Sequence, residues 1–331
     1  MTRTSSRPAL GVAMVAVSSI LFAVNGTVSK LILRAGLDAP RLTVLRASGA
    51  FLGLLGLVAL TRPGRLGRLR ATRRELPLLV VYGLAGFFLV PMLYFIGIGR
   101  LPVGISLLFE YTAPVLVALW ARFGAHQRVK PRLWVGLALS LAGLAAVAEI
   151  WRVWQSGAAT LNPVGVAAAL SAAVLLALYY VLSARGVARR DNLSLTCWAF
   201  GVAAVAGMLV RPWWTFPFHL FTARSNGVPV WLLALYLIIG GSIAPYLLIV
   251  AALRHLPPTS VGIIGMIEPV VASAVAWVVL HERLDPAQLL GGALILAGVA
   301  LAETARTAAP RAPATAGESY PFAVARRGDG G

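Results

Sequence analysis

Charged side chains are scarce in this chain, and acidic ones are the scarcest. Only 12% of the 331 residues are charged, and 11 Asp and Glu stand against 29 Lys and Arg. A soluble domain carries about 25% charged residues. Because 59% of the residues are apolar, the composition predicts an all-α integral membrane protein. Each of its helices needs about 20 residues to cross the hydrocarbon.

Reactive and metal-binding residues are also few. Cys197 is the single cysteine, so the chain has no disulfide framework. The four histidines lack the spacing of a zinc site, and no G-x-x-x-x-G-K-[ST] loop is present for ATP. The sequence also lacks a nucleophile–base constellation. We therefore expect no metal, no cofactor and no enzymatic activity.

The apolar residues fall into ten segments separated by prolines and charged residues. Prolines at segment starts are tolerated, because the first turn of a helix makes no use of their missing N–H. Prolines inside a segment free backbone carbonyls that neighbours or a water-lined cavity must satisfy; these are Pro91, Pro114, Pro245 and Pro269. The predicted spans are residues 9–29, 42–60, 77–98, 102–121, 133–150, 163–182, 193–210, 229–252, 258–280 and 287–303.

The second half of the chain repeats the first. Residues 101–147 align with residues 256–302 at a constant offset of 155, without a gap, and fifteen positions coincide. Earlier segments match more weakly at an offset of 154, through Gly11/Gly165, Ala23/Ala177, Ser29/Ser183, Gly86/Gly240 and Pro91/Pro245. A period this long predicts two copies of one unit.

Positive charge predicts the orientation of the spans. The N-terminus, the tail and the loops after even-numbered spans hold 20 Lys and Arg, whereas the loops after odd-numbered spans hold 8. Positively charged loops stay in the cytoplasm, so both termini are expected there, in a plasma (bacterial inner) membrane. The net charge of +18 is explained by this orientation, and nucleic acid is not an expected partner.

Five spans in each copy is an odd number, so the second copy must enter the membrane from the opposite side. The predicted fold is ten transmembrane helices arranged as two inverted five-helix repeats, residues 9–150 and 161–303, followed by a disordered cytoplasmic tail over residues 304–331. Inverted repeats are typical of secondary transporters, whose site lies between the repeats near the bilayer midplane. Exchanging the conformations of two such halves opens the site to each side in turn.

The most specific segments are LPVGISLLFEYTAPVLVAL at residues 101–119 and LPPTSVGIIGMIEPVVASAVAWVVLHERLD at residues 256–285. These segments resemble the EamA-type exporters of the drug/metabolite transporter superfamily. The resemblance implies ten helices, alternating access and a cavity lined by spans 1–4 and 6–9, with spans 5 and 10 peripheral. It also implies small substrates such as amino acids, other metabolites or drugs. The first copy departs from the pattern, since Gln127 occupies the position of Glu282 and Glu110 does not align with Glu268.

Three ionisable residues lie inside predicted spans: Arg46, Glu110 and Glu268. Each costs about 3 kcal/mol at the centre of a helix in lipid, so such residues usually face a cavity or a partner. The two carboxylates would contact a cationic substrate group or bind a proton; alternatively, they hydrogen-bond carbonyls freed by Pro114 and Pro269. Arg46 would bind a substrate carboxylate, pair with Glu110, or snorkel to the outer interface.

Polar and aromatic residues supply the other candidates. Asn25 belongs to a stripe with Ser18, Phe22 and Ser29 on one helix face, and Ser106 precedes Glu110 by one turn. They would line the cavity or join helices by hydrogen bonds. The aromatic candidates for the cavity wall, for which plain packing is the alternative, are Tyr94, Tyr111, Tyr180, Trp198 and Tyr246.

Together these patterns predict a secondary active transporter. The resemblance favours an exporter of small metabolites such as amino acids or of drug-like compounds. The alternative is a structural or assembly membrane protein that transports nothing. The expected partners are a small-molecule substrate and the lipid bilayer, with a homodimer as one option for its assembly.

Overall fold

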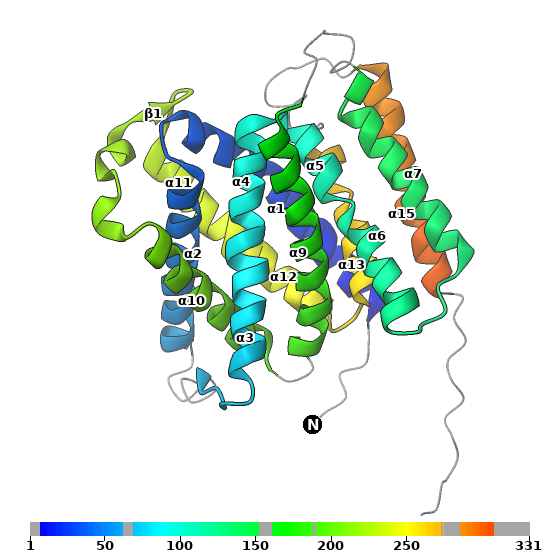
Figure 1. Ribbon diagram of the computed structural model, residues 1–331, viewed down its shortest axis with the longest axis horizontal. Helices are drawn as coiled ribbons and strands as arrows, with labels where there is room; N and C mark the ends of the chain where they lie inside the picture. Colours follow the sequence, from blue (N-terminus) through cyan, green and yellow to red (C-terminus); the bar gives the residue numbers. More distant parts are fainter. Residues whose placement is uncertain are drawn as a thin grey trace, which may run out of the picture.

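The computed structural model describes residues 7–61, 69–151, 161–187, 190–272, 274 and 285–307. These parts of the chain are almost entirely helical (Figure 1). Among the described residues, one short hairpin pairs β1 (Arg224–Ser225) with β2 (Val228–Pro229) in antiparallel register. Its turn contains Asn226 and Gly227, both with positive φ, as tight hairpin turns require.

The first repeat begins with two long helices and continues through shorter ones. Their bounds are α1 (Pro8–Arg34), α2 (Ala39–Thr61), α3 (Leu76–Tyr82), η2 (Gly83–Leu89), α4 (Val90–Arg100), α5 (Val103–Glu110), α6 (Ala113–Leu119), η3 (Trp120–Gly124) and α7 (Pro131–Val147). The second repeat has helices at matched positions, with η4, η5 and the hairpin added between α10 and α11. Its elements are α9 (Pro163–Val187), α10 (Asn192–Val210), η4 (Trp213–Thr215), η5 (Phe218–Thr222), α11 (Val230–Ile238), η6 (Ile239–Ile243), α12 (Ala244–Ala252), α13 (Pro258–Gly265) and α15 (Pro286–Thr307).

Within the described residues, eight helices are long and apolar enough to cross a membrane. Two shorter apolar helices, Pro131–Val147 and Pro258–Ala272, fall on the fifth and ninth predicted spans. The chain is therefore an all-α, multi-pass membrane protein. Several predicted ends fell short of the helices: α1 continues to Arg34 and α9 to Val187, five residues beyond the predicted spans. Helix α15 continues to Thr307, so residues 304–307 of the predicted tail are helical. The rest of that tail, the loop at residues 62–68 and the end of the ninth span lie outside the described residues.

The internal prolines divide predicted spans into shorter pieces. Pro91 and Pro245 follow the π-helical segments η2 and η6, and Pro114 follows a turn at Tyr111 and Thr112. Proline has no N–H, so the carbonyl four residues before it loses its helical donor. π-Helical segments inside α-helices occur mostly as such local irregularities, frequently at functional sites.

Helices α7 and α15 form a separate pair at one side of the bundle (Figure 1). Glycines bring their backbones together, because a Cβ on Gly143 would lie 2.5 Å from the carbonyl oxygen of Gly291. A Cβ on Gly136 would lie 2.6 Å from the carbonyl oxygen of Gly298. Small residues permit this close approach of helices in membranes.

Matched positions of the two repeats make matched contacts. Gly11 on α1 packs against Leu256 and His255, and Gly165 on α9 packs against Leu101 and Arg100. Exchanging the halves at the offsets of 154 and 155 converts one set of contacts into the other. The same exchange relates the two glycine contacts of α7 and α15.

One end of the bundle is tied together by arginines. Arg190 contacts the Glu75 carboxylate at 3.2 Å and donates to the carbonyl oxygen of Arg70. Arg254 donates to the carbonyl oxygen of Arg190 at 2.8 Å. Hydrogen bonds to Glu75 from the backbone N–H of Thr72 and from Arg190 hold the pKa of this carboxyl below its usual value. The segments before α3 and α10 and after α12 therefore meet at this end.

Candidate functional site

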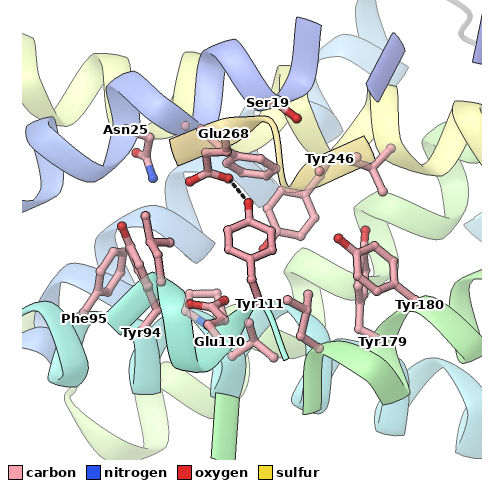
Figure 2. A pocket seen from close by; sticks show the side chains of 18 of the residues that line it. Ser19, Asn25, Tyr94, Phe95, Glu110, Tyr111, Tyr179, Tyr180, Tyr246 and Glu268 are labelled. Atoms are coloured by element: carbon pink, nitrogen blue, oxygen red, sulfur yellow. Dashed lines mark hydrogen bonds between the residues drawn. The ribbon is translucent and has the colours of Figure 1, made fainter. Parts of the chain in front are cut away.

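A cavity of about 110 Å³ lies among the middle portions of the bundle helices. Figure 2 shows its side chains converging from several elements. The lining residues are Ser19, Phe22, Asn25, Arg46, Val90, Pro91, Tyr94, Phe95, Leu107, Glu110, Tyr111, Leu176, Tyr179, Tyr180, Gly241, Tyr246, Ile249, Gly265 and Glu268. Helices from both repeats therefore contribute to one cavity.

Both predicted carboxylates line this cavity, in different surroundings. Tyr111 donates a hydrogen bond to Glu268 Oε2 at 2.6 Å (Figure 2), which joins the first repeat to the second. Glu110 is 9% exposed, and its Oε2 has no hydrogen-bond partner among the described residues. A buried acceptor without a partner is costly. This oxygen is therefore available to a donor that enters the cavity.

The helix breaks add backbone acceptors to the same place. Pro114 cannot donate to the carbonyl of Glu110, and Pro269 cannot donate to the carbonyl of Gly265. Glu110 and Gly265 occupy matched positions of the two repeats, at an offset of 155, and both line the cavity. Discontinuous helices of this kind typically form the sites of secondary transporters. The Glu268 carboxylate, one residue before Pro269, accepts a hydrogen bond from Tyr111.

Arg46 is 2% exposed, so it does not snorkel to the interface. Its Nη1 donates to the carbonyl oxygen of Phe87 at 3.2 Å, the carbonyl that Pro91 leaves without a helical donor. Its guanidinium also lies 4.9 Å from the ring centroid of Tyr246, a cation–π contact. No carboxylate among the described residues lies within ion-pair distance of Arg46, so the expected alternative of a pair with Glu110 was wrong.

The polar candidates divide between cavity and packing. Asn25 lines the cavity, is 7% exposed, and its Oδ1 has no partner among the described residues. It packs closely against Gly241, where any Cβ would collide with the carboxamide. Ser106 is buried outside the lining; its Oγ would meet a Cβ on Gly97. The close approach of α4 and α5 thus places Ser106 between helices.

Four of the five aromatic candidates line the cavity, and the fifth lies elsewhere. Tyr94, Tyr111, Tyr180 and Tyr246 are lining residues. Trp198 instead faces an apolar groove formed by α2, α3 and α10 and donates its indole N–H to the carbonyl oxygen of Leu69 at 2.7 Å. This carbonyl oxygen satisfies the indole N–H, because a buried Trp N–H needs a partner.

Sequence reasoning missed several lining residues, of which Tyr179 is the most informative. Its ring stacks on Tyr82, with centroids 5.6 Å apart, and contacts Phe87 and Tyr246. It is 3% exposed. The sequence repeat could have indicated Tyr179, since it matches the candidate Asn25 at the offset of 154.

The sequence pattern of the EamA-like transporter family matches residues 9–148 and, a second time, residues 163–304. The chain belongs to this family. Each match covers one copy of the duplicated unit, and together they span most of the transporter. The residues that carried the resemblance in the sequence therefore reflect common ancestry.

Curated relatives of this family member are named as transporters. It is 30% identical over 278 residues to the threonine/homoserine exporter RhtA of Escherichia coli strain K12, covering 81% of this chain and 83% of that protein. It is 28% identical over 267 residues to a probable terminal-alkyne amino-acid exporter of Streptantibioticus cattleyicolor, with the same coverage. A solved crystal structure shares its fold, with a TM-score of 0.70, 22% identity and coverage of 92% of this chain and 100% of the other.

Proposed function

We propose that this protein is a secondary active exporter of small amino acids, which bind in the cavity between its two repeats. The observation that carries the proposal is the set of ionisable groups around one small space: Arg46, Glu110 and Glu268 line the same cavity, and no ion pair joins Arg46 to either carboxylate among the described residues. A zwitterion offers a carboxylate to the guanidinium and an ammonium to the carboxylates. The names of the relatives support the same substrate class.

The size of the cavity supports a small substrate. One water needs about 10–15 Å³ of such space, so 110 Å³ holds on the order of ten waters. Threonine and homoserine have about as many non-hydrogen atoms, whereas drug-sized ligands occupy pockets of about 300–1,000 Å³. In the conformation described, the site therefore favours a compact metabolite over a drug-like compound.

The proposed mechanism is alternating access by two inverted five-helix repeats, residues 9–150 and 161–303. The reciprocal contacts of Gly11 and Gly165 and the two family matches support two equivalent halves. The positive charges predict that both termini and the end of the bundle containing Arg190, Glu75 and Arg254 face the cytoplasm. The contacts among these three residues would close the transporter at that end. A gradient of protons or of substrate would drive transport.

Counterflow of radiolabelled threonine and homoserine in proteoliposomes tests the proposal. The wild type should accumulate label against unlabelled internal substrate, and Glu110→Gln or Glu268→Gln should lower the rate at least tenfold while inserting normally. Asp38→Asn provides the matched control, since Asp38 pairs with Arg41 at 3.0 Å away from the cavity. This control should transport like the wild type.

The same preparation separates a transporter from a structural membrane protein. A ligand that binds the native state but not the unfolded chain stabilises it by RT ln(1 + [L]/Kd), so threonine should raise the melting temperature of the wild type but not that of Glu110→Gln. Absence of both counterflow and a ligand-dependent shift for every amino acid would contradict the proposed amino-acid exporter, and the same result with other metabolites and drug-like compounds would favour the non-transporting structural or assembly protein.

A further inference from the structure

The two repeats contribute different chemistry at matched positions of the cavity. Helices α1 and α9 correspond at the offset of 154, so Phe22 matches Leu176 and Asn25 matches Tyr179. All four line the cavity. The next pair along the helices is Gly26 and Tyr180. The central part of α1 is thus small and polar where that of α9 carries two phenol rings.

At a second matched pair, the larger side chain belongs to the first repeat. Glu110 in α5 corresponds to Gly265 in α13 at the offset of 155. In the second repeat, Tyr180 covers glycines: a Cβ on Gly265 would lie 3.7 Å from the Tyr180 hydroxyl, and one on Gly262 would lie 3.5 Å from its ring. In the first repeat, the small residue is Gly26 and the large one is Glu110. Each repeat therefore combines one large and one small residue at these positions. The large residue is the carboxylic acid Glu110 in the first repeat and the phenol Tyr180 in the second.

This asymmetry divides the cavity into two poles. The polar pole contains Asn25 and Glu110, both at least nine-tenths buried, each with one oxygen that has no partner among the described residues. The aromatic pole contains Tyr179 and Tyr180, whose ring centroids are 5.3 Å apart. Figure 2 shows Asn25 and these two tyrosines at opposite ends of the pocket.

We propose that Tyr180 determines the largest substrate that the transporter accepts. The ammonium group of the substrate lies at the polar pole, where the partnerless oxygen of Glu110 accepts a hydrogen bond from it, and its side chain points toward the aromatic pole. The ring of Tyr180 ends the space available to that side chain. This inference rests on the proposed function and adds the residue that sets specificity.

Replacing Tyr180 by glycine, the residue at its matched position, tests the inference. Removal of the ring opens a second small-residue subsite at the aromatic pole. Counterflow rates would be measured in proteoliposomes for threonine, leucine, phenylalanine and tryptophan, with each rate divided by that of threonine. Even one methylene in an apolar pocket changes discrimination by about tenfold or more. The relative rate for phenylalanine should therefore rise at least tenfold in Tyr180→Gly.

Two further variants make the result decisive. Leu178→Gly places the same flexible residue on α9, at a side chain that is 38% exposed and outside the cavity lining, and it should keep the wild-type preference. Tyr180→Leu shortens the side chain while preserving helix propensity, and it should give an intermediate preference if Tyr180→Gly does not insert.

The outcomes separate the two proposals. A wild type that exchanges threonine, with the same relative rates in whichever of Tyr180→Gly and Tyr180→Leu folds, would overturn the role of Tyr180 and leave the exporter intact. A wild type that exchanges no amino acid would remove the proposed function itself. A shift toward larger substrates in Tyr180→Gly but not in Leu178→Gly supports the inference.

Discussion

Glu110 and Glu268 line the same cavity, but their partners differ. Glu268 accepts a hydrogen bond from Tyr111 at 2.6 Å, whereas Glu110 keeps an oxygen without a partner among the described residues. A buried polar atom without a partner carries a desolvation cost of about 1–3 kcal/mol. A ligand that supplies a donor recovers this free energy at Glu110. Of the two acids, Glu110 therefore gains more hydrogen-bonding free energy when a ligand enters the cavity.

Replacing Tyr111 by phenylalanine separates the hydrogen bond from the charge. Side-chain hydrogen bonds inside membranes contribute about 0.6 kcal/mol on average and at most about 1.7, so Tyr111→Phe should lower the free energy of unfolding by only about this amount. Transport should fall more strongly, because the Glu268 carboxylate loses the contact that orients it. Thermal unfolding in detergent and counterflow in liposomes measure the two effects.

Tyr236→Phe is the matched control for this variant. Tyr236 donates to the carbonyl oxygen of Leu21 at 3.1 Å and does not line the cavity. It should show a comparable small loss of stability with wild-type transport. Equal transport in Tyr111→Phe and Tyr236→Phe would contradict an orienting role for Tyr111.

At the scale of the elements, the pair α7 and α15 has a different role from the helices around the cavity. Neither helix supplies a lining residue, and both bury glycines against each other. The backbone contact leaves no room for a side chain at these positions. We expect this pair to stabilise the fold without contacting substrate.

Adding one methyl group to this interface should destabilise the protein. A Cβ on Gly143 would lie 2.5 Å from one backbone atom and 2.8 Å from another on α15, so the helices must separate. Overpacking of this kind costs about 1–3 kcal/mol. Gly143→Ala should therefore lower the melting temperature while any folded fraction retains the substrate affinity of the wild type.

Gly56→Ala on α2 is the control, because nothing lies within 4 Å of a Cβ at that position. There the loss of backbone freedom in the unfolded chain should raise stability by about 0.5–1 kcal/mol. A melting temperature for Gly143→Ala at or above that of Gly56→Ala would contradict close packing of α7 on α15.

At the scale of the whole molecule, the proposed inversion places matched residues on opposite sides of the membrane. Arg100 ends α4 in the first repeat, and His255 follows α12 at the offset of 155. Arg100→Cys and His255→Cys, each in a Cys197→Ala background, should react with a membrane-impermeant maleimide from opposite faces. Labelling of both from the same face would contradict the inverted arrangement.

The positions of most helices could be predicted from hydropathy, because helices in lipid need long apolar segments. Prolines helped to place the helix starts, where their missing N–H is tolerated. The intramembrane charges were likewise visible, and Arg46, Glu110 and Glu268 all line the cavity. Trp198 shows the limit of this reasoning. Aromatic residues suit both cavities and lipid-facing grooves, so composition alone does not distinguish the two.

The amino-acid sequence by itself determined the membrane class, the duplication and the family, since each follows from residue types and from their order along the chain. Only the tertiary structure decided which side chains meet. The contact of Tyr111 with Glu268 spans 157 residues, and the capping of the Phe87 carbonyl by Arg46 joins two helices. Such contacts depend on how helices rotate and cross, which the period of the apolar residues leaves open.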